Sequence, residues 1–225
     1  MPIYRGMLRR RSATMPQSCP AAVTATTWLD RQRVEPSDHG FLATSGGPAS
    51  ATIVRVLADV DLRPASPDQV ADVLAVLNEA ARWLRDQSIR QWPAAFEAEW
   101  VLPSVLSGET WVARRAGVPI ATITLGWADP LWPDDQLAGY VHRLARTRDA
   151  VGIGDHLLRW AIDRVRERGR DVVRLDCVAS NARLRTFYEA RAFLHRGDAA
   201  VGGPPGSRSN EGAMTVVSLY ERQTS

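Results

Sequence analysis

A loop with two glycines between a strand and a helix constrains this chain more than any other feature of its sequence. The strand pattern of residues 138–146 ends in the short segment 147–151, and an amphipathic helix follows Gly152-Ile-Gly154. Backbone N–H groups converge at a helix start, where the helix dipole is positive, and glycines let the main chain approach an anion closely. The geometry therefore suits a phosphate group. An ordinary strand–helix turn also produces a G-x-G, so the motif alone leaves both interpretations open.

A second helix, one strand further along the chain, favours the phosphate interpretation. This helix is predicted over residues 181–191, and Asn181 and Tyr188 lie seven residues apart, on the same helical face. Taken singly, Asn181 reads as a helix cap and Tyr188 as a half-buried aromatic residue. Asn181 and Tyr188 follow the glycine loop at a distance that a β-α-β unit could bring back toward that loop. Taken together with the glycines, the two residues therefore favour one ligand site that includes all of them.

The remaining hydrophobic pattern predicts a mixed α/β domain with the order β-α-α-β-β-β-α-β-α-β. The predicted strands cover residues 58–63, 109–114, 119–127, 138–146, 172–178 and 213–220. The first predicted helix starts at Ser66-Pro-Asp-Gln69, a capping signature, and the second is opened by Pro93. The segments 128–135 and 197–212 are predicted to be loops.

The N-terminal segment, residues 1–52, is rich in Pro, Ser, Thr, Gly and Arg and has no sustained hydrophobic period. We expect a poorly packed tail there and a single domain over residues 53–225. The tail has six arginines against three acidic residues, and the rest of the chain balances 22 basic against 22 acidic residues. A neutral domain is a poor match for nucleic acid, so we interpret the arginines as a solvated tail rather than a nucleic-acid arm.

The absence of lysine excludes several chemistries, because all 28 basic residues are arginine. A Walker A lysine, a pyridoxal-phosphate Schiff base and a lysine nucleophile are ruled out. Cys19 and Cys177 form no metal-binding pattern with the four histidines, so no metal site is expected, and Cys177 reads as a small buried hydrophobic residue. No apolar stretch has the length of a membrane span, and we expect a cytoplasmic protein without a membrane partner.

The two glycine- and tyrosine-bearing segments resemble the motifs of the GNAT N-acetyltransferase superfamily, and the likeness extends over residues 53–222. The glycine loop is similar to Q/R-x-x-G-x-G/A, and residues 181–193 are similar to N-x-x-A-x-x-L-Y-x-x-x-G-F. The resemblance implies a mixed, mostly antiparallel sheet flanked by helices, with a central β-α-β unit that binds acyl-CoA. It implies an acetyl-CoA-dependent N-acetyltransferase that works by direct attack in a ternary complex. A non-catalytic acyl-CoA-binding regulatory module on the same fold is the alternative.

The resemblance also implies which residues bind acetyl-CoA. The main chain of Leu144, Ala145 and Arg146 would pair with the pantetheine arm, Asn181 would touch pantetheine, and Tyr188 would face the sulfur and protonate the departing thiolate. The residues that would surround the pyrophosphate are Asp149, Ala150, Val151, Gly152, Ile153, Gly154 and Asp155. Three positions depart from the family pattern, namely Asp149, Leu184 and Ala192; Asp149 brings a negative charge near the phosphates, which Arg148 could offset.

The acceptor side is less constrained by the sequence. His142 is the nearest candidate for a base, although a hydrogen-bonded strand histidine explains it as well. The acidic residues of the loop 128–135 (Asp129, Asp134 and Asp135) could attract a cation. Five tryptophans, at 83, 92, 100, 127 and 132, would form either an aromatic pocket wall or plain core. A small-molecule amine is the expected acceptor, with a protein N-terminus as the alternative, and a homodimer is compatible with the resemblance.

Overall fold

The structure is a computed structural model that describes residues 59–134, 136–202 and 214–225. The predicted tail, residues 1–52, lies outside these ranges, so the boundary between tail and domain stays a prediction. In chain order the elements are β1 (Val60–Pro64), η1 (Pro67–Gln69), α2 (Val70–Asp86), α3 (Ala98–Leu106), β2 (Thr110–Arg115), β3 (Val118–Gly126), β4 (Ala138–Arg146), α4 (Ile153–Glu167), β5 (Val172–Val178), α5 (Ala182–Glu189), β6 (Leu194–Gly202) and β7 (Met214–Gln223).

The described strands form one seven-stranded sheet in the order β1-β2-β3-β4-β5-β7-β6. Strands β1 to β4 form an antiparallel meander, and β5, β7 and β6 are also antiparallel to their neighbours. The pair β4–β5 is parallel, and α4 makes the crossover between the two strands. The predicted fold class is therefore confirmed: a mixed, mostly antiparallel sheet with a central β-α-β unit.

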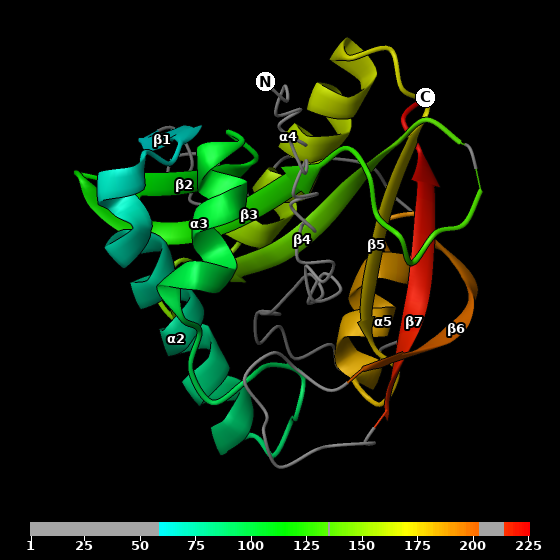
Figure 1. Ribbon diagram of the computed structural model, residues 1–225, viewed down its shortest axis with the longest axis horizontal. Helices are drawn as coiled ribbons and strands as arrows, with labels where there is room; N and C mark the ends of the chain where they lie inside the picture. Colours follow the sequence, from blue (N-terminus) through cyan, green and yellow to red (C-terminus); the bar gives the residue numbers. More distant parts are fainter. Residues whose placement is uncertain (1–58, 135, 203–213) are drawn as a thin grey trace, which may run out of the picture.

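The two central strands pair only at one end. Parallel pairing runs from Ala138↔Val172 to Tyr140↔Arg174, yet β4 continues to Arg146. A register shift in the β3–β4 pairing accompanies a positive φ of 49° at Arg143, which marks a bulge that bends β4 away. Figure 1 shows β4 and β5 meeting near the C-terminus and diverging below it. We call this separation the split.

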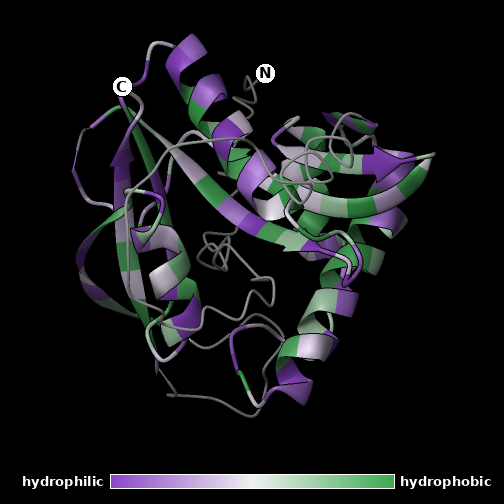
Figure 2. Ribbon diagram, turned by 180° about the vertical axis from the view of Figure 1, so that it is seen from behind, coloured by the Kyte–Doolittle hydropathy of each residue, from purple (hydrophilic) through white to green (hydrophobic). Residues whose placement is uncertain are grey.

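Helices cover both faces of the sheet. The apolar face of α2 packs with α3 against Val112 and Ala145, whereas α4 packs against the neighbouring strand residues Ala113 and Leu144. Successive strand residues point to opposite faces, so α2 and α3 lie on one face and α4 lies on the other, as Figure 1 shows. In Figure 2 hydrophobic and hydrophilic residues alternate along α4, as expected for a helix with one buried side.

The second predicted helix begins later than the sequence indicates. Pro93 was expected to open it, but α3 starts at Ala98 and residues 93–97 are not helical. A tertiary contact explains the difference, because the side chain of Asn78 accepts a hydrogen bond from the Phe96 N–H at 2.6 Å and donates to the Phe96 carbonyl at 3.5 Å. Asn78 lies on α2, so the segment is shaped by a distant element rather than by its own helix signals.

The prediction that residues 197–212 form a loop is wrong for residues 197–202. These residues belong to β6, which pairs with β7 from Leu194↔Glu221 to Gly202↔Met214. Gly197 has a φ of 116° at a register shift, which breaks the local strand pattern. The partner strand lies beyond position 213, so the pairing is non-local and weakly marked in the sequence. Residues 203–212 lie outside the described part of the chain.

Candidate active site

The loop between β4 and α4 is held by its own main chain and by one guanidinium. We call residues 147–152 the donor loop. The Ala150 N–H donates to the Thr147 carbonyl at 3.2 Å, and the Thr147 N–H donates to the Ile120 carbonyl at 2.8 Å. Arg146 Nη1 donates to the carbonyls of Thr147 at 2.9 Å and Arg148 at 2.8 Å. The loop is thus fixed before any ligand arrives.

The start of α4 is built to receive an anion. Its N-cap is Gly152, at a φ of 82°, a left-handed conformation that glycine adopts without strain. The first N–H groups of a helix have no partner within the helix, and glycine has no side chain to cap them. A Cβ placed on Gly154 would meet no atom within 4 Å. The main chain can therefore be approached closely at this point, and the residues present fit a phosphate group.

Two acidic side chains near the helix start are neutralised locally. Asp149 accepts a hydrogen bond from Thr147 Oγ1 at 2.7 Å, and this bond, together with the charges of Arg115 and Arg146, lowers the pKa of Asp149. The sequence had pointed to Arg148 as the counter-charge. Asp155 pairs with Arg191 and, at 3.1 Å, with Arg159. The Asp155 carboxylate thus ties α4 to Arg191, just beyond α5, and the contact of Asp155 with a ligand stays a prediction.

The expected pantetheine-binding residues lie along the split. Ala145 and Arg146 pair with Thr122 and Ala121 of β3 on one edge. On the opposite edge of β4, the described strand pairs with β5 end at Tyr140. The main chain of Leu144, Ala145 and Arg146 therefore borders the split, and its pairing with pantetheine stays a prediction.

Asn181 acts as the cap of α5. Its Oδ1 accepts from the Leu184 N–H at 3.2 Å, and its Nδ2 donates to Gln91 Oε1 at 2.8 Å. The simple interpretation of Asn181 as a helix cap is confirmed, and a role toward pantetheine stays a prediction. Gln91 was not singled out from the sequence, because only the tertiary structure brings the connection between α2 and α3 against α5.

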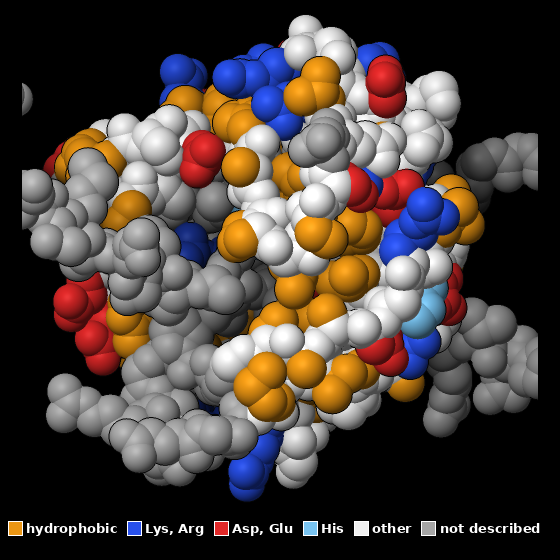
Figure 3. Space-filling view, turned by 45° about the vertical axis from the view of Figure 1, so that its right-hand side comes forward, with side chains coloured by type: hydrophobic (Ala, Val, Ile, Leu, Met, Phe, Trp, Pro, Cys, Tyr) orange, Lys and Arg blue, Asp and Glu red, His pale blue; other side chains and the backbone are white. Residues whose placement is uncertain are grey.

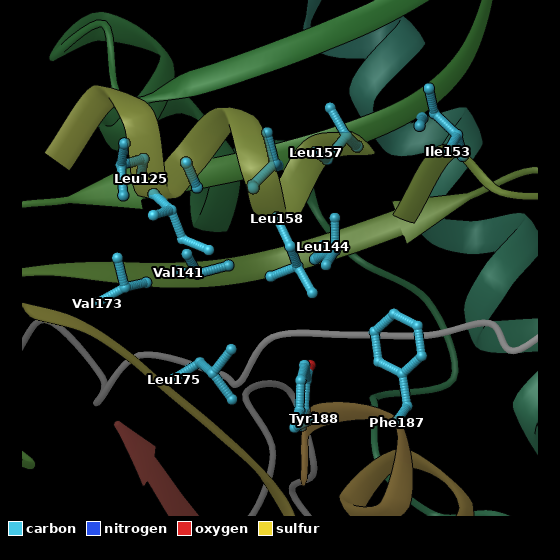
Figure 4. Packing of buried hydrophobic residues seen from close by; sticks show 14 of the residues in the cluster. Leu125, Val141, Leu144, Ile153, Leu157, Leu158, Val173, Leu175, Phe187 and Tyr188 are labelled. Carbon is cyan, nitrogen blue, oxygen red and sulfur yellow. The ribbon is translucent and has the colours of Figure 1, made fainter. Parts of the chain in front are cut away.

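Tyr188 is fully buried, with its ring packed at 5.6 to 5.7 Å from the rings of Phe187, Phe193 and Tyr220. Burial raises the pKa of Tyr188 well above its ordinary value, and the nearby Cys177 and Asp176 raise it further. The phenol therefore stays protonated at neutral pH, which is the form that can donate a proton. In Figure 4 the ring lies below β4, with Leu144 of β4 above it and Leu175 of β5 beside it. Cys177 itself is buried within the core, as predicted.

Three further ionisable side chains are buried on the β3–β4 loop, on β4 and on β5, and we call Asp129, His142 and Asp176 the acceptor cluster. His142 Nε2 is 3.6 Å from Asp129 Oδ2. Burial, and then the charge of Arg143, lowers the pKa of His142 to about 3, so the ring is neutral. Its Nδ1 is buried without a hydrogen-bond partner. The interpretation of His142 as a hydrogen-bonded strand histidine is therefore wrong at this atom.

Asp176 completes the acceptor cluster and was missed by the sequence analysis. It lies on β5 two residues beyond Arg174, the last residue paired with β4, and is 1% exposed. Its Oδ2 has no hydrogen-bond partner, and burial followed by the charge of Asp129 raises the pKa of Asp176. An Asp within an apolar strand pattern is a signal that could have identified this residue. Nothing in the local sequence showed that β5 stops pairing with β4 before this position.

The second half of the loop between β3 and β4 is anchored by a buried arginine. Arg174 binds both carboxylate oxygens of Asp134, at 2.7 and 2.8 Å, and also Gln136 Oε1 and Glu221 Oε2, each at 2.8 Å. Its guanidinium stacks on Trp132 at 4.3 Å. Asp134 is therefore engaged and is not the free cation-attracting carboxylate that the sequence allowed. Asp135 lies outside the described residues.

The tryptophans are mainly structural. Trp92 and Trp132 are buried in two core clusters, and Trp83 and Trp100 pack at the edge of the α2 cluster. Trp127 lies beneath Arg168 and Arg170, with guanidinium carbons 4.2 and 5.1 Å from its ring. The core alternative thus fits these residues better than a pocket wall.

Basic side chains gather at the upper end of the molecule in Figure 3, where Figure 1 places the end of α4. Two arginines in the last turn of α4 are paired with acidic neighbours on the same helix, Arg164 with Glu167 and Arg166 with Asp163. In the described ranges, no helix is long and apolar enough to cross a membrane, and no group of His, Cys, Asp and Glu side chains is arranged to hold a metal ion.

Comparison with known proteins agrees with this geometry. The chain is 28% identical over 151 residues to the uncharacterised N-acetyltransferase YesJ of Bacillus subtilis, covering 62% of this chain and 84% of that protein. A GNAT acetyltransferase from Listeria monocytogenes has a similar fold, with a TM-score of 0.59 at 21% identity, covering 73% of this chain and 94% of the other. The structure of yncA from Salmonella typhimurium, solved with its cofactor acetyl-CoA, gives a TM-score of 0.54 at 15% identity over 74% and 94% of the two chains.

The sequence profile of the acetyltransferase (GNAT) family matches residues 77–193, which is just over half of the chain. The matched region begins within α2 and includes the split, the donor loop and Tyr188. The chain therefore belongs to the GNAT acetyltransferase family.

Proposed function

We propose that this protein is an acetyl-CoA-dependent N-acetyltransferase that moves the acetyl group directly to a small-molecule amine while both substrates are bound. The observation that carries the proposal is the split between β4 and β5, which opens beside a helix start whose Gly154 faces free space. An anion at α4 and an extended arm along β4 would place the acyl end between the acceptor cluster and Tyr188.

The donor half of the site would be formed by main-chain groups. The N–H groups at the start of α4 would bind the pyrophosphate, and the β5-facing edge of Leu144, Ala145 and Arg146 would pair with pantetheine. The neighbouring structures of yncA, with acetyl-CoA, and of N-acetylglutamate synthase from Neisseria gonorrhoeae, with coenzyme A, support an acyl-CoA as the ligand. The latter has a TM-score of 0.51 at 18% identity.

Tyr188 would supply the proton that the departing sulfur needs. Its raised pKa keeps the hydroxyl protonated, and its neighbours Cys177 and Asp176 lie on β5 at the split. A buried phenol that served packing alone would be replaceable by phenylalanine. The buried position beside the diverging strands supports a donor role instead.

The first test measures binding and turnover in the full-length protein. Acetyl-CoA is expected to raise the melting temperature, and a thiol-release assay with a panel of primary amines is expected to detect turnover. Binding without release of free thiol above the hydrolysis background would favour the non-catalytic acyl-CoA-binding module. Absence of binding would contradict both assignments.

Replacement of one hydroxyl group tests the acid. Tyr188→Phe is expected to lower kcat by about 10²-fold with nearly unchanged acetyl-CoA affinity, because the ring is retained and only the proton donor is lost. Tyr220→Phe is a matched control, since its ring packs on Tyr188 at 5.7 Å and its hydroxyl bonds Glu189 and Arg185. The control is expected to change stability more than rate. Full activity of a folded Tyr188→Phe protein would assign the proton to another donor.

A further inference from the structure

Two carboxyl groups of the acceptor cluster are buried, and within residues 59–134, 136–202 and 214–225 neither of them pairs with an arginine. Asp176 is 1% exposed, Asp129 is 7% exposed, and the charge of one raises the pKa of the other. Asp129 Oδ1 accepts one backbone hydrogen bond, from the Leu131 N–H at 2.9 Å. Asp176 Oδ2 has none. A buried carboxyl in this state costs stability unless a ligand completes its hydrogen bonding.

The charged groups nearby do not fill that role. Arg174 is engaged by Asp134, Gln136 and Glu221. Arg143 lies beside His142 on β4, and its two terminal nitrogens donate hydrogen bonds to the Trp100 carbonyl and the Ser104 hydroxyl of α3. Its Nε is buried without a hydrogen-bond partner. His142 of the same cluster and the neighbours Tyr188 and Cys177 are neutral at pH 7. The charge of Arg185 reaches Cys177, but the Arg185 guanidinium donates to the Tyr220 hydroxyl at 3.1 Å.

We propose, resting on the acetyltransferase function above, that Asp176 and Asp129 bind the ammonium group of the acceptor and that Asp176 accepts its proton, which selects amines with no carboxylate on the adjacent carbon. The cation supplies the hydrogen bonds that the buried carboxyls lack. A substrate carboxylate at that position would meet two acidic side chains and be repelled.

The protons of the transfer balance in this arrangement. The bound ammonium gives one proton to the Asp176 carboxylate, and the neutral amine forms the new C–N bond as the C–S bond of the thioester breaks. The sulfur takes a proton from Tyr188, and the second proton lost by nitrogen restores the phenol. The proton on Asp176 is released to solvent when the products leave, so one proton appears for each amide formed.

Pairs of compounds that differ by one carboxylate test the selectivity in the wild-type full chain. Suitable pairs are phenethylamine and phenylalanine, and 3-methylbutylamine and leucine, in which the amino acid has no second amine. Within any pair that is turned over, the thiol-release assay is expected to give the amine a kcat/KM at least about 10-fold above that of the amino acid. A higher kcat/KM for the amino acid would indicate that its carboxylate binds a cation such as Arg143, and would overturn the proposal.

The variant Asp176→Asn tests the carboxyl itself. It is expected to raise the KM for the amine at least about 10-fold and to leave acetyl-CoA binding unchanged, with Asp129→Asn acting in the same direction. The distant surface variant Asp61→Asn is the control and should match wild type, since this side chain is half-exposed on β1 and pairs with Arg63. Unchanged amine kinetics in a folded Asp176→Asn protein would overturn the proposal.

A stability measurement gives a readout that needs no substrate. Because Asp176 lacks a partner, Asp176→Asn is expected to keep or raise the melting temperature of the free protein at pH 7, relative to Asp61→Asn. A fall of several degrees in that comparison would show a structural carboxyl and overturn the proposal. Failure of acetyl-CoA to bind the wild-type protein would instead contradict the acetyltransferase function, so the two failures are distinguishable.

Discussion

The two halves of the candidate site differ in the chemical groups that would contact a ligand. The donor half, formed by the donor loop and the start of α4, relies on main-chain groups, a left-handed glycine at 152 and the absence of a side chain at 154. The acceptor half relies on the side chains of Asp129, His142 and Asp176, which come from a loop and two strands. Main-chain recognition depends on conformation and space, whereas side-chain recognition depends on charge and protonation.

This difference predicts different responses to mutation. In the donor half, a larger side chain is expected to lower acetyl-CoA affinity, whereas a changed side-chain charge is expected to leave that affinity nearly unchanged. In the acceptor half, loss of a single ionisable group is expected to change the proton balance while the fold is kept. Three substitutions test this contrast, beginning with the one of largest expected effect.

Gly154→Leu is expected to lower acetyl-CoA affinity at least about 100-fold, because the new side chain projects into the space that the ligand needs. The fold should accept it, since a Cβ there meets no atom within 4 Å and leucine favours a helix over glycine by up to about 1 kcal/mol. A titration of acetyl-CoA followed by tryptophan fluorescence measures the affinity, and thermal unfolding measures the stability.

Gly202→Leu is the matched control for this substitution. A Cβ at Gly202 also meets no atom within 4 Å, and the residue lies at the end of β6, away from α4. The control should bind acetyl-CoA as wild type does. Normal affinity of a folded Gly154→Leu protein would place the pyrophosphate elsewhere and remove the contrast between the two halves.

His142→Gln is expected to reduce the acid sensitivity of the fold. The pKa of His142 is about 3 in the folded protein, below its ordinary value of 6.5. Between these values the unfolded chain binds the proton and the folded chain does not, so stability is present above pH 6.5 and is lost as pH falls toward 3. One such group contributes a slope of up to about 1.4 kcal/mol per pH unit.

Urea unfolding from pH 7 to pH 4 measures that slope. As the pH falls, the free energy of unfolding of the variant should decrease less steeply than that of the wild-type protein. The difference in slope should be up to about 1.4 kcal/mol per pH unit, which corresponds to the uptake of one proton. Equal slopes for the two proteins would show that His142 takes up its proton without unfolding, in which case the acceptor half is open to solvent.

Asp149→Asn is expected to have the smallest effect, a change in acetyl-CoA affinity within about 3-fold. The amide keeps an oxygen that can accept the Thr147 hydroxyl, and the charge removed is already balanced by Arg115 and Arg146. A loss of 10-fold or more in the same fluorescence titration would show that this carboxylate acts on the ligand directly, so that the donor half also depends on side-chain charge.

The sequence predicted the elements with strong local signals. The hydrophobic period of α4 and the apolar run of β5 gave elements that the structure confirms, and Ser66 with Gln69 formed the expected capping pair, with Ser66 N–H donating to Gln69 Oε1 at 3.1 Å. The predictions that were wrong concern segments whose structure depends on contacts with residues distant in the sequence. Asn78 shapes the segment before α3, and β7 supplies the partner that makes a strand of residues 197–202.

The sequence by itself determined the donor half, because glycine spacing, a strand end and a helix start are local properties that survive in any fold containing them. Only the tertiary structure decided the acceptor half. The bulge at Arg143 bends β4 away from β5, so Asp176 pairs with β7 on one edge of β5 and has no strand pair with β4 on the other. There the charge of Asp129, from a loop 47 positions earlier in the chain, acts on it. Burial then sets the protonation of these groups, and burial is a property of the assembled core rather than of any segment.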